Sequence, residues 1–214
     1  MLKPPNREVF AGLGMGRGLF VTIDGPDGVG KSTQVSRLVE SFRSQGRETI
    51  RTREPGGTAL GERLREVLLS SVDPDPWTEL MIVQAARVQH DREVLRPSLE
   101  AGRVVVSDRY LASSYVYQGR MRGLGLSAVD QTLALLDFLS MPDLTIILDR
   151  PSPQGSFTFD RADLFETGGL DVWNVIREGF LECADRFGWS VVDAQGSVEQ
   201  VAEKIWELVG GLES

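Results

Sequence analysis

A glycine-rich stretch near the N-terminus has the residue types and the spacing of a phosphate-binding loop. In "FVTIDGPDGVGKST" (20–33), Gly25-x-x-x-x-Gly30-Lys31-Ser32 follows an apolar, strand-like run and precedes a helical pattern. The backbone N–H groups of such a loop bind phosphate oxygens, its lysine can bridge the outer phosphates, and its hydroxyl can ligate Mg²⁺. The alternative, a chance glycine turn before a helix, is disfavoured by this context. The candidate phosphate-binding residues are Gly25, Pro26, Asp27, Gly28, Val29, Gly30, Lys31, Ser32 and Thr33.

Asp27 places a carboxylate inside this loop. A carboxylate beside phosphate oxygens would repel them, so we expect its side chain to point away from the bound phosphates. The loop alone does not specify an enzyme, because switch GTPases carry the same element. Their guanine-reading Asn-Lys-x-Asp motif is impossible here, since neither asparagine of the chain, Asn6 or Asn174, is followed by lysine.

The stretch "SDRYLASSYVYQGR" (107–120) supplies a second group of candidates. Asp108 ends a short apolar run, where a carboxylate suits Mg²⁺ held directly or through water. Arg109 follows and could donate two parallel hydrogen bonds to a phosphate. Tyr117 and Gln118 offer a flat ring and an amide group to a base or a sugar. Alternatively, Asp108 caps the next helix and the tyrosine belongs to the core.

Two further stretches hold arginines of interest. In "TREPGGTALGERLREVLL" (52–69), Arg53 and Arg65 are candidate anion contacts, although for this stretch taken alone a Pro-Gly turn with a solvated helix face is the favoured interpretation. In "ELMIVQAARVQH" (79–90), Arg87 interrupts an apolar helical face, so we expect it to meet a buried partner or a ligand. His90 is the only histidine and is interpreted as a packing residue without a chemical role.

Strand-like and helical patterns alternate along the chain, which predicts a doubly wound α/β fold with a parallel sheet. Ligands of such sheets bind at the carboxyl ends of the strands, so the candidate stretches should converge there. Strands are expected at 19–24, 48–52, 103–108, 144–149 and 189–194. Helices are expected at 31–44, 60–70, 77–101 (where Pro97 could introduce a kink), 127–139, 170–187 and 198–209.

Composition and charge exclude other classes. The 214 residues, 41% hydrophobic and 25% charged, are those of an ordinary globular chain. The net charge of −8 argues against broad polynucleotide binding, and no apolar run approaches the roughly 20 residues that span a bilayer. The single cysteine, Cys183, excludes an internal disulfide and indicates a core residue in a cytoplasmic protein.

The organisation of the chain is predicted to be simple. Residues 1–17 mix proline, glycine and charge without periodicity, so we expect a disordered tail, and translation could begin at Met15 instead of Met1. Residues 18–214 show neither a repeat nor a linker and are expected to form a single domain.

Together, "GPDGVGKST", "TREPGGTALGERLRE" and "SDRYLASSYVYQG" resemble the bacterial thymidylate kinases, which belong to the nucleoside monophosphate kinases. The resemblance extends from Gly18 nearly to the C-terminus, and "REPGGT" followed by "DRY…YQG" is its most specific part. It implies a five-stranded parallel sheet flanked by helices, with a lid that closes over ATP. It also implies γ-phosphoryl transfer from ATP to dTMP, giving dTDP and ADP, with Mg²⁺ as cofactor and a homodimer as the assembly.

The same resemblance suggests a role for each candidate. Lys31, Ser32 and the loop backbone would hold the ATP phosphates, and Asp27 would accept a hydrogen bond from the 3′-hydroxyl of the acceptor sugar. Ser32 and Asp108 would hold Mg²⁺. The acceptor nucleotide would contact Asp27, Arg53, Arg87, Arg109, Ser114, Tyr117 and Gln118, and the catalytic residues would be Asp27, Lys31, Arg109 and Arg161.

Two stretches depart from the family pattern. The expected lid, about 150–166, offers only Arg150 and Arg161 as arginines, and Arg150 would have to compensate for a missing one. Val83 stands four residues before Arg87, where the family usually has a phenylalanine that stacks on the base. These departures leave two alternatives open: a kinase of the same fold for another deoxynucleoside monophosphate, and a slow or inactive nucleotide-binding paralogue.

Overall fold

The computed structural model describes residues 17–70, 73–151 and 169–212, and its centre is a five-stranded parallel sheet in the order β2-β3-β1-β4-β5. The strand β1 lies between β3 and β4, so the direction of winding reverses beside the glycine loop that follows β1. Such a reversal opens a crevice at the carboxyl ends of the strands. The predicted doubly wound α/β fold is confirmed.

The expected strands and helices are present, with small shifts at their ends. The strands are β1 (Phe20–Asp24), β2 (Thr49–Arg53), β3 (Val104–Asp108), β4 (Leu144–Asp149) and β5 (Ser190–Asp193). The α-helices are α1 (Lys31–Ser44), α2 (Ala59–Leu69), α3 (Pro76–His90), α4 (Arg96–Glu100), α5 (Leu111–Ser114), α6 (Leu126–Ala134), α8 (Gly169–Phe187) and α9 (Val198–Gly210), and two π-helical segments are η2 (Asp91–Leu95) and η3 (Tyr115–Met121).

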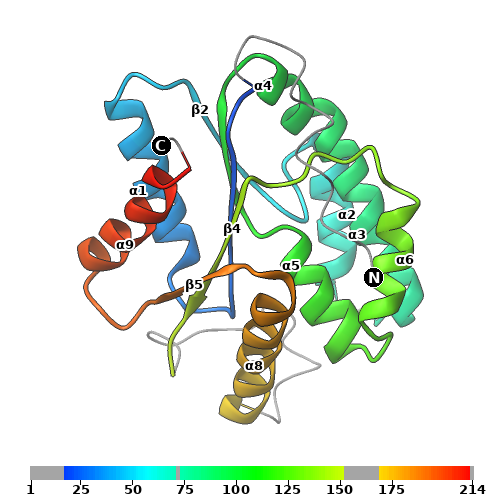
Figure 1. The fold of residues 1–214 in the computed structure, drawn as a ribbon. Coiled ribbons are helices and arrows are strands. Elements are labelled where there is room, and N and C mark those ends of the chain that lie inside the picture. The colour runs from blue at the N-terminus through cyan, green and yellow to red at the C-terminus, as the bar shows by residue number, and fades with distance from the viewer. Residues whose placement is uncertain (1–16, 71–72, 152–168, 213–214) are drawn as a thin grey trace.

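Helices cover both faces of the sheet (Figure 1), and each face has its own apolar core. Side chains of β3 alternate between them: Val104 and Val106 pack with α1 and α9, whereas Val105 packs with α3, η3 and α8. All three valines are fully buried. Continuous burial of this kind explains why the central strands read as unbroken apolar runs in the sequence.

Polar side chains at the helix starts fix where several helices begin. Thr58 accepts a hydrogen bond from the Gly61 N–H at the start of α2, and Asp75 accepts one from the Trp77 N–H at the start of α3. In α9, Ser197 and Gln200 form a reciprocal capping box. These caps place α2 and α3 beside the carboxyl edge of the sheet, where the candidate site lies.

Two helices differ from the predictions. The helix predicted over 127–139 ends at Ala134, because turns follow it. The stretch 77–100 is helical throughout, and Ala101 lies in the turn that follows. The helix is interrupted by the π-helical segment η2, which ends two residues before Pro97. Within the described ranges, no helix is long and apolar enough to cross a bilayer.

Several predictions fall on residues outside these ranges. Residues 1–16 of the expected tail, most of the expected lid and Arg161 are among them. Arg17, the last residue of the expected tail, is described, and its guanidinium donates to the Met141 carbonyl at 3.1 Å.

Candidate active site

Two adjoining cavities lie at the carboxyl ends of β1, β2 and β3. The larger cavity, about 410 Å³, is lined by the glycine loop, Arg53 and Asp108. The smaller cavity, about 180 Å³, is lined mainly by side chains of α2, α3 and η3. Both cavities share the side chains Asp27, Glu54, Arg65 and Arg109. The arrangement provides two compartments that meet at one charged boundary.

The glycine loop joins β1 to α1 and opens into the larger cavity. Gly25 has φ 141°, and a Cβ there would lie 2.7 Å from the Leu148 carbonyl oxygen, so only glycine fits. Gly30 has φ 103° and directly precedes the first turn of α1. Because the first N–H groups of a helix lack partners within it, this end of α1 is an anion site. Val29 is buried in the core on the α1 face and anchors the loop.

Lys31 and Arg109 flank the carboxylate of Asp27. Asp27 lies 3.5 Å from the Lys31 ammonium and accepts a short hydrogen bond from the Arg109 guanidinium. Burial opposes ionisation of Asp27, but Arg109 and Lys31 outweigh it and lower the pKa of the carboxyl to about 2. Burial also disfavours the charged form of Lys31 and, with Arg109 nearby, lowers its pKa to about 8. The Lys31 ammonium donates to the Pro26 carbonyl at 2.7 Å.

Arg109 is held at the boundary between the cavities from several sides. Its backbone has φ 72°, an uncommon conformation for a residue with a side chain. Its guanidinium donates to the Ser113 hydroxyl at 3.0 Å and lies over the Tyr117 ring, 5.2 Å from the centroid. Ser113 in turn donates to Asp24 at 2.7 Å. Burial keeps the pKa of Asp24 above its usual range, although Ser113 and Arg109 oppose this.

Ser32 and Asp108 meet in the larger cavity, where the Ser32 hydroxyl donates to Asp108 Oδ2 at 2.7 Å. One hydroxyl and one carboxylate fit Mg²⁺, which keeps several waters and takes its other ligands from phosphates. Within the described ranges, no group of three His, Cys, Asp or Glu residues could hold a metal ion by itself. The pair therefore suits a metal that arrives with a nucleotide.

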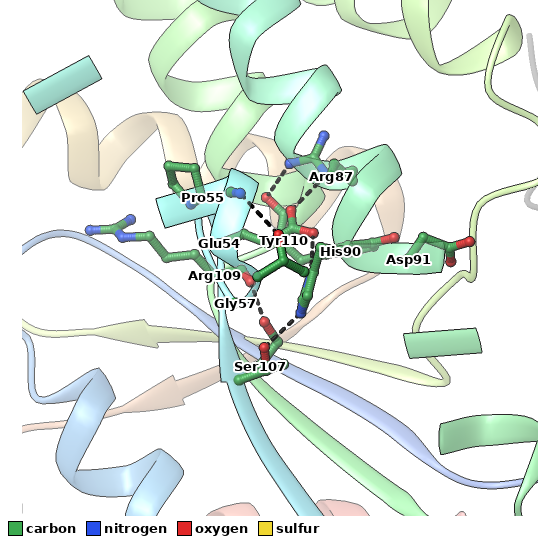
Figure 2. A network of polar contacts seen from close by, with 12 residues as sticks. Glu54, Pro55, Gly57, Arg87, His90, Asp91, Ser107, Arg109 and Tyr110 are labelled. Atoms are coloured by element: carbon green, nitrogen blue, oxygen red, sulfur yellow. Dashed lines mark hydrogen bonds and ion pairs between the residues drawn. The ribbon is translucent and has the colours of Figure 1, made fainter. Parts of the chain in front are cut away.

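A buried polar network connects the end of β2 with α3 (Figure 2). Glu54 accepts a hydrogen bond from Arg87 Nε at 2.7 Å, and its other oxygen lies 2.9 Å from His90 Nδ1. The far nitrogen of His90 pairs with the Thr52 hydroxyl at 2.6 Å. The interpretation of His90 as a packing residue is supported, and Arg87 has the buried partner that its position in an apolar face predicts. A Cβ at Gly57 would lie 2.7 Å from the His90 ring.

The smaller cavity contains most of the predicted acceptor residues. Arg87, Ser114, Tyr117 and Gln118 line it, and Arg87 Nη2 donates to the Ser114 hydroxyl at 3.0 Å. Val83 lines the same cavity as a small aliphatic side chain. The apolar side chains Leu68, Leu69 and Met121 line it as well. The cavity thus combines an apolar wall with many polar and charged groups, which suits a small ligand that has both a flat apolar surface and polar edges.

Arg53 lies apart from this group. It lines the larger cavity, and its guanidinium donates to Glu62 at 2.7 Å while about half of the side chain stays exposed. Among the predicted lid residues, Arg150 is described, and its Nε and Nη1 atoms are buried without a hydrogen bond to any other described residue. The structure thus places most of the described candidates around the two cavities, whereas Gly25, Pro26, Val29 and Arg150 are in neither lining.

The sequence-based predictions missed several residues of this site. Trp173 on α8 is fully buried and donates to the Asp27 carbonyl at 2.8 Å, tying α8 to the glycine loop. Glu54 and Ser113 hold Arg87 and Arg109, and both lie next to predicted residues in the chain. A carboxylate directly after a strand was a usable signal for Glu54, whereas the long-range contact of Trp173 had none.

Comparisons with known proteins agree with this geometry. The sequence profile of the thymidylate kinase family matches residues 23–205. Thymidylate kinases of Pseudomonas fluorescens (strain Pf0-1) and Deinococcus radiodurans are 42% and 41% identical to this chain, covering 91% of it and 99% and 98% of their own length. The crystal structure of thymidylate kinase from Ehrlichia chaffeensis matches with a TM-score of 0.73 at 27% identity, covering 90% of this chain and 99% of that one. This chain belongs to the thymidylate kinase family.

Proposed function

We propose that this chain transfers the γ-phosphoryl group of ATP to dTMP, giving dTDP and ADP, in the cytoplasmic synthesis of dTTP. The observation that carries this proposal is the pair of cavities that meet at Asp27 and Arg109. One is lined by a phosphate-binding loop, and the other has the polar and apolar lining of a base pocket. Two nucleotides placed in them would meet with their phosphates at the shared boundary.

The reaction needs alignment and charge neutralisation. An oxygen of the dTMP phosphate attacks the γ-phosphorus of ATP in line, a new O–P bond forms, and the bond to the β,γ-bridging oxygen breaks as ADP leaves. The attacking oxygen is already anionic, so no side chain has to act as a strong base. Holding both nucleotides in place converts a bimolecular encounter into an intramolecular one.

Two cations lie where charge would develop. Lys31 enters from the glycine loop, and Arg109 stands between the cavities, held by Ser113, Asp27 and Tyr117. Their preorganisation means that little rearrangement is required in the transition state. Mg²⁺, held through Ser32 and Asp108, would neutralise charge on the donor phosphates when bound. Arg161 is a further candidate from the lid.

Asp27 has a different role in this proposal. Its carboxylate lies at the boundary of the cavities and is ionised, which makes it an acceptor for the 3′-hydroxyl of the acceptor sugar. A hydrogen bond to a charged group contributes roughly 1.5–3 kcal/mol net. Arg109 and Lys31 compensate its charge, so the carboxylate can remain close to a phosphate site.

A substrate panel tests the proposal. Equal concentrations of dTMP, dUMP, dCMP, dGMP and dAMP are incubated with ATP and Mg²⁺, and the ADP and nucleoside diphosphate formed are measured. We expect dTMP to have the highest kcat/KM and Lys31→Ala to lose activity by orders of magnitude while keeping its fold. If another monophosphate outran dTMP, the alternative kinase would be supported, for which the aliphatic Val83 in the base pocket is the specific observation. Binding without turnover would instead indicate an inactive paralogue.

We also infer that the enzyme is a homodimer. Large apolar side chains are exposed on α2 and α3, among them Leu60, Val67, Trp77 and Met81, each at least 46% exposed. These helices pack against each other on one side of the molecule (Figure 1), and exposed apolar clusters commonly mark an interface. Met81→Glu should give a monomer by light scattering, whereas the control Val191→Glu on β5 should leave a dimer. A wild-type monomer would refute this inference.

A further inference from the structure

Glu79 is a buried carboxylate in the wall of the smaller cavity. It lies in the first turn of α3, and only 3% of its surface is exposed. The structure gives it no place in the phosphate chemistry, because the glycine loop and Asp108 line the other cavity. A carboxylate this deeply buried is costly unless it is paired and hydrogen-bonded, so its partners indicate what it does.

Gln118 and Arg122 both contact the buried Glu79 carboxylate. Gln118 Nε2 donates to Glu79 Oε1 at 2.7 Å, and Arg122 Nε lies 3.0 Å from Glu79 Oε2. Arg122 is itself anchored, since its Nη2 donates to Asp73 Oδ1 at 2.8 Å and to the Pro74 carbonyl. The first turn of a helix also favours a negative charge. Glu79 is therefore held in place by an ion pair with Arg122 and accepts a hydrogen bond from Gln118.

This pairing fixes which way the Gln118 amide faces. An amide has one donor end and one acceptor end, and its neighbours decide between the two orientations. Glu79 Oε1 accepts from the NH₂ end, which leaves the carbonyl oxygen of Gln118 for the cavity that this residue lines. No hydrogen-bond partner for that oxygen is found among residues 17–70, 73–151 and 169–212.

We propose that Glu79 is a positioning residue that makes the acceptor site select pyrimidines carrying a proton on N3. This inference rests on the proposed function, because it places the base of the acceptor in the smaller cavity. Thymine and uracil present an N3–H, which the fixed Gln118 carbonyl accepts. Cytosine presents a lone pair at N3, so two acceptors would face each other in a desolvated pocket. Leaving a buried polar group unpaired is what makes such discrimination strong.

The variant Glu79→Gln tests the proposal, with dUMP and dCMP as the matched substrates. The introduced amide can either accept or donate, so the Gln118 side chain is free to turn its NH₂ group toward the base. We expect the ratio of kcat/KM for dUMP to that for dCMP to fall about ten-fold or more, the change produced by one hydrogen bond that no longer discriminates. The KM for ATP should not change.

Two further variants separate positioning from general damage. Glu182→Gln removes a carboxylate partner of Arg120, on the same π-helical segment as Gln118, and should leave the ratio unchanged. The exchange Glu79→Gln/Gln118→Glu again places an acceptor-only group toward N3 and should restore most of the ratio. A structural role alone would instead lower turnover of dUMP and dCMP equally and would not be rescued by the exchange.

A binding measurement distinguishes failure of this inference from failure of the proposed function. Calorimetry gives the Kd values of dUMP and dCMP, and their ratio reports the preference for dUMP without any turnover. If the wild type bound dUMP no better than dCMP, or if Glu79→Gln kept the wild-type ratio, the role of Glu79 would be refuted. If the wild type preferred dUMP to dCMP but did not phosphorylate dTMP, the proposed reaction would fail while the role of Glu79 remained supported.

Discussion

At the scale of single residues, Asp27 shows how a carboxylate can belong to an anion-binding loop. Its side chain contacts Lys31 and Arg109, and both cations lower its pKa to about 2 in spite of burial. The loop therefore presents its backbone to one cavity and a compensated carboxylate to the boundary with the other. The expectation that this side chain avoids the phosphates stays a prediction, because the positions of the nucleotides follow from the proposed function.

Replacing Asp27 tests the assignment of the two cavities. Asp27→Asn keeps the shape of the side chain but removes its charge, so the hydrogen bond to the acceptor sugar should weaken. We expect the KM for dTMP to rise about ten-fold or more, since a charged hydrogen bond contributes roughly 1.5–3 kcal/mol, and the KM for ATP to change much less. Steady-state kinetics with each substrate varied in turn provides the comparison. An equal rise in both KM values would show that Asp27 does not contact the acceptor nucleotide selectively.

Lys31 predicts a specific pH dependence. Burial and the nearby Arg109 lower its pKa to about 8, so the free enzyme loses this positive charge as the pH rises through that value. Because kcat/KM reports the ionisation of the free enzyme, kcat/KM for ATP should fall about ten-fold per pH unit above the pKa. Lys31→Arg should be less active but should lack this decline, since arginine stays charged. If kcat/KM for ATP still declined at high pH in Lys31→Arg, the decline would have to come from another ionisable group.

The residues of the site differed in how far the sequence could predict them. Lys31 begins α1 in a recognisable glycine motif, Asp108 ends β3 and Arg109 follows it, and all three line the larger cavity. The contacts of Glu79 with Gln118 and of Trp173 with Asp27 join residues 39 and 146 positions apart, so no local pattern indicates them. Side chains that only orient other side chains leave little trace in a single sequence.

At the scale of secondary structure, two helix-cap variants should have similar effects on stability but different effects on substrate binding. Ser197→Ala removes the cap of α9, which supports the core on the α1 side of the sheet. Thr58→Ala removes the cap of α2, which carries Arg65 at the boundary of the cavities. Each variant should lower the free energy of unfolding by about 1 kcal/mol.

Their kinetics should differ, because the two helices have different positions. Thr58→Ala should also raise the KM for dTMP, whereas Ser197→Ala should leave both KM values unchanged. Chemical denaturation and steady-state kinetics of the same preparations give the two readouts. Identical kinetic effects in both variants would show that the position of α2 is not what the acceptor requires.

The pattern of apolar residues predicted most of these elements but not their irregular parts. Strands with buried side chains on both faces gave clear signals, as Val104–Asp108 does. The π-helical segment η2 lies within a stretch predicted as one ordinary helix, whereas no helix was predicted over η3. The segment η3 matters for function, since it carries Tyr117 and Gln118 in the wall of the smaller cavity.

At the scale of the whole molecule, the sheet order creates the site. The strand β1 lies between β3 and β4, and this order directs the glycine loop, Asp108 and Arg53 to one edge. Alternation of strands and helices was enough to predict the doubly wound fold and the edge that binds ligands. It could not predict that two cavities would share Arg109 and Asp27, because this depends on how α2, α3 and η3 pack above that edge.

The central claim is that two nucleotides bind end to end across this shared boundary. The most direct test measures the binding of a single molecule in which adenosine and thymidine are joined 5′ to 5′ by five phosphates. The account predicts that it competes with both ATP and dTMP and binds at least about ten-fold more tightly than either, because linkage makes the second contact intramolecular. Competition with only one nucleotide, or an affinity no better than that of dTMP alone, would contradict the account.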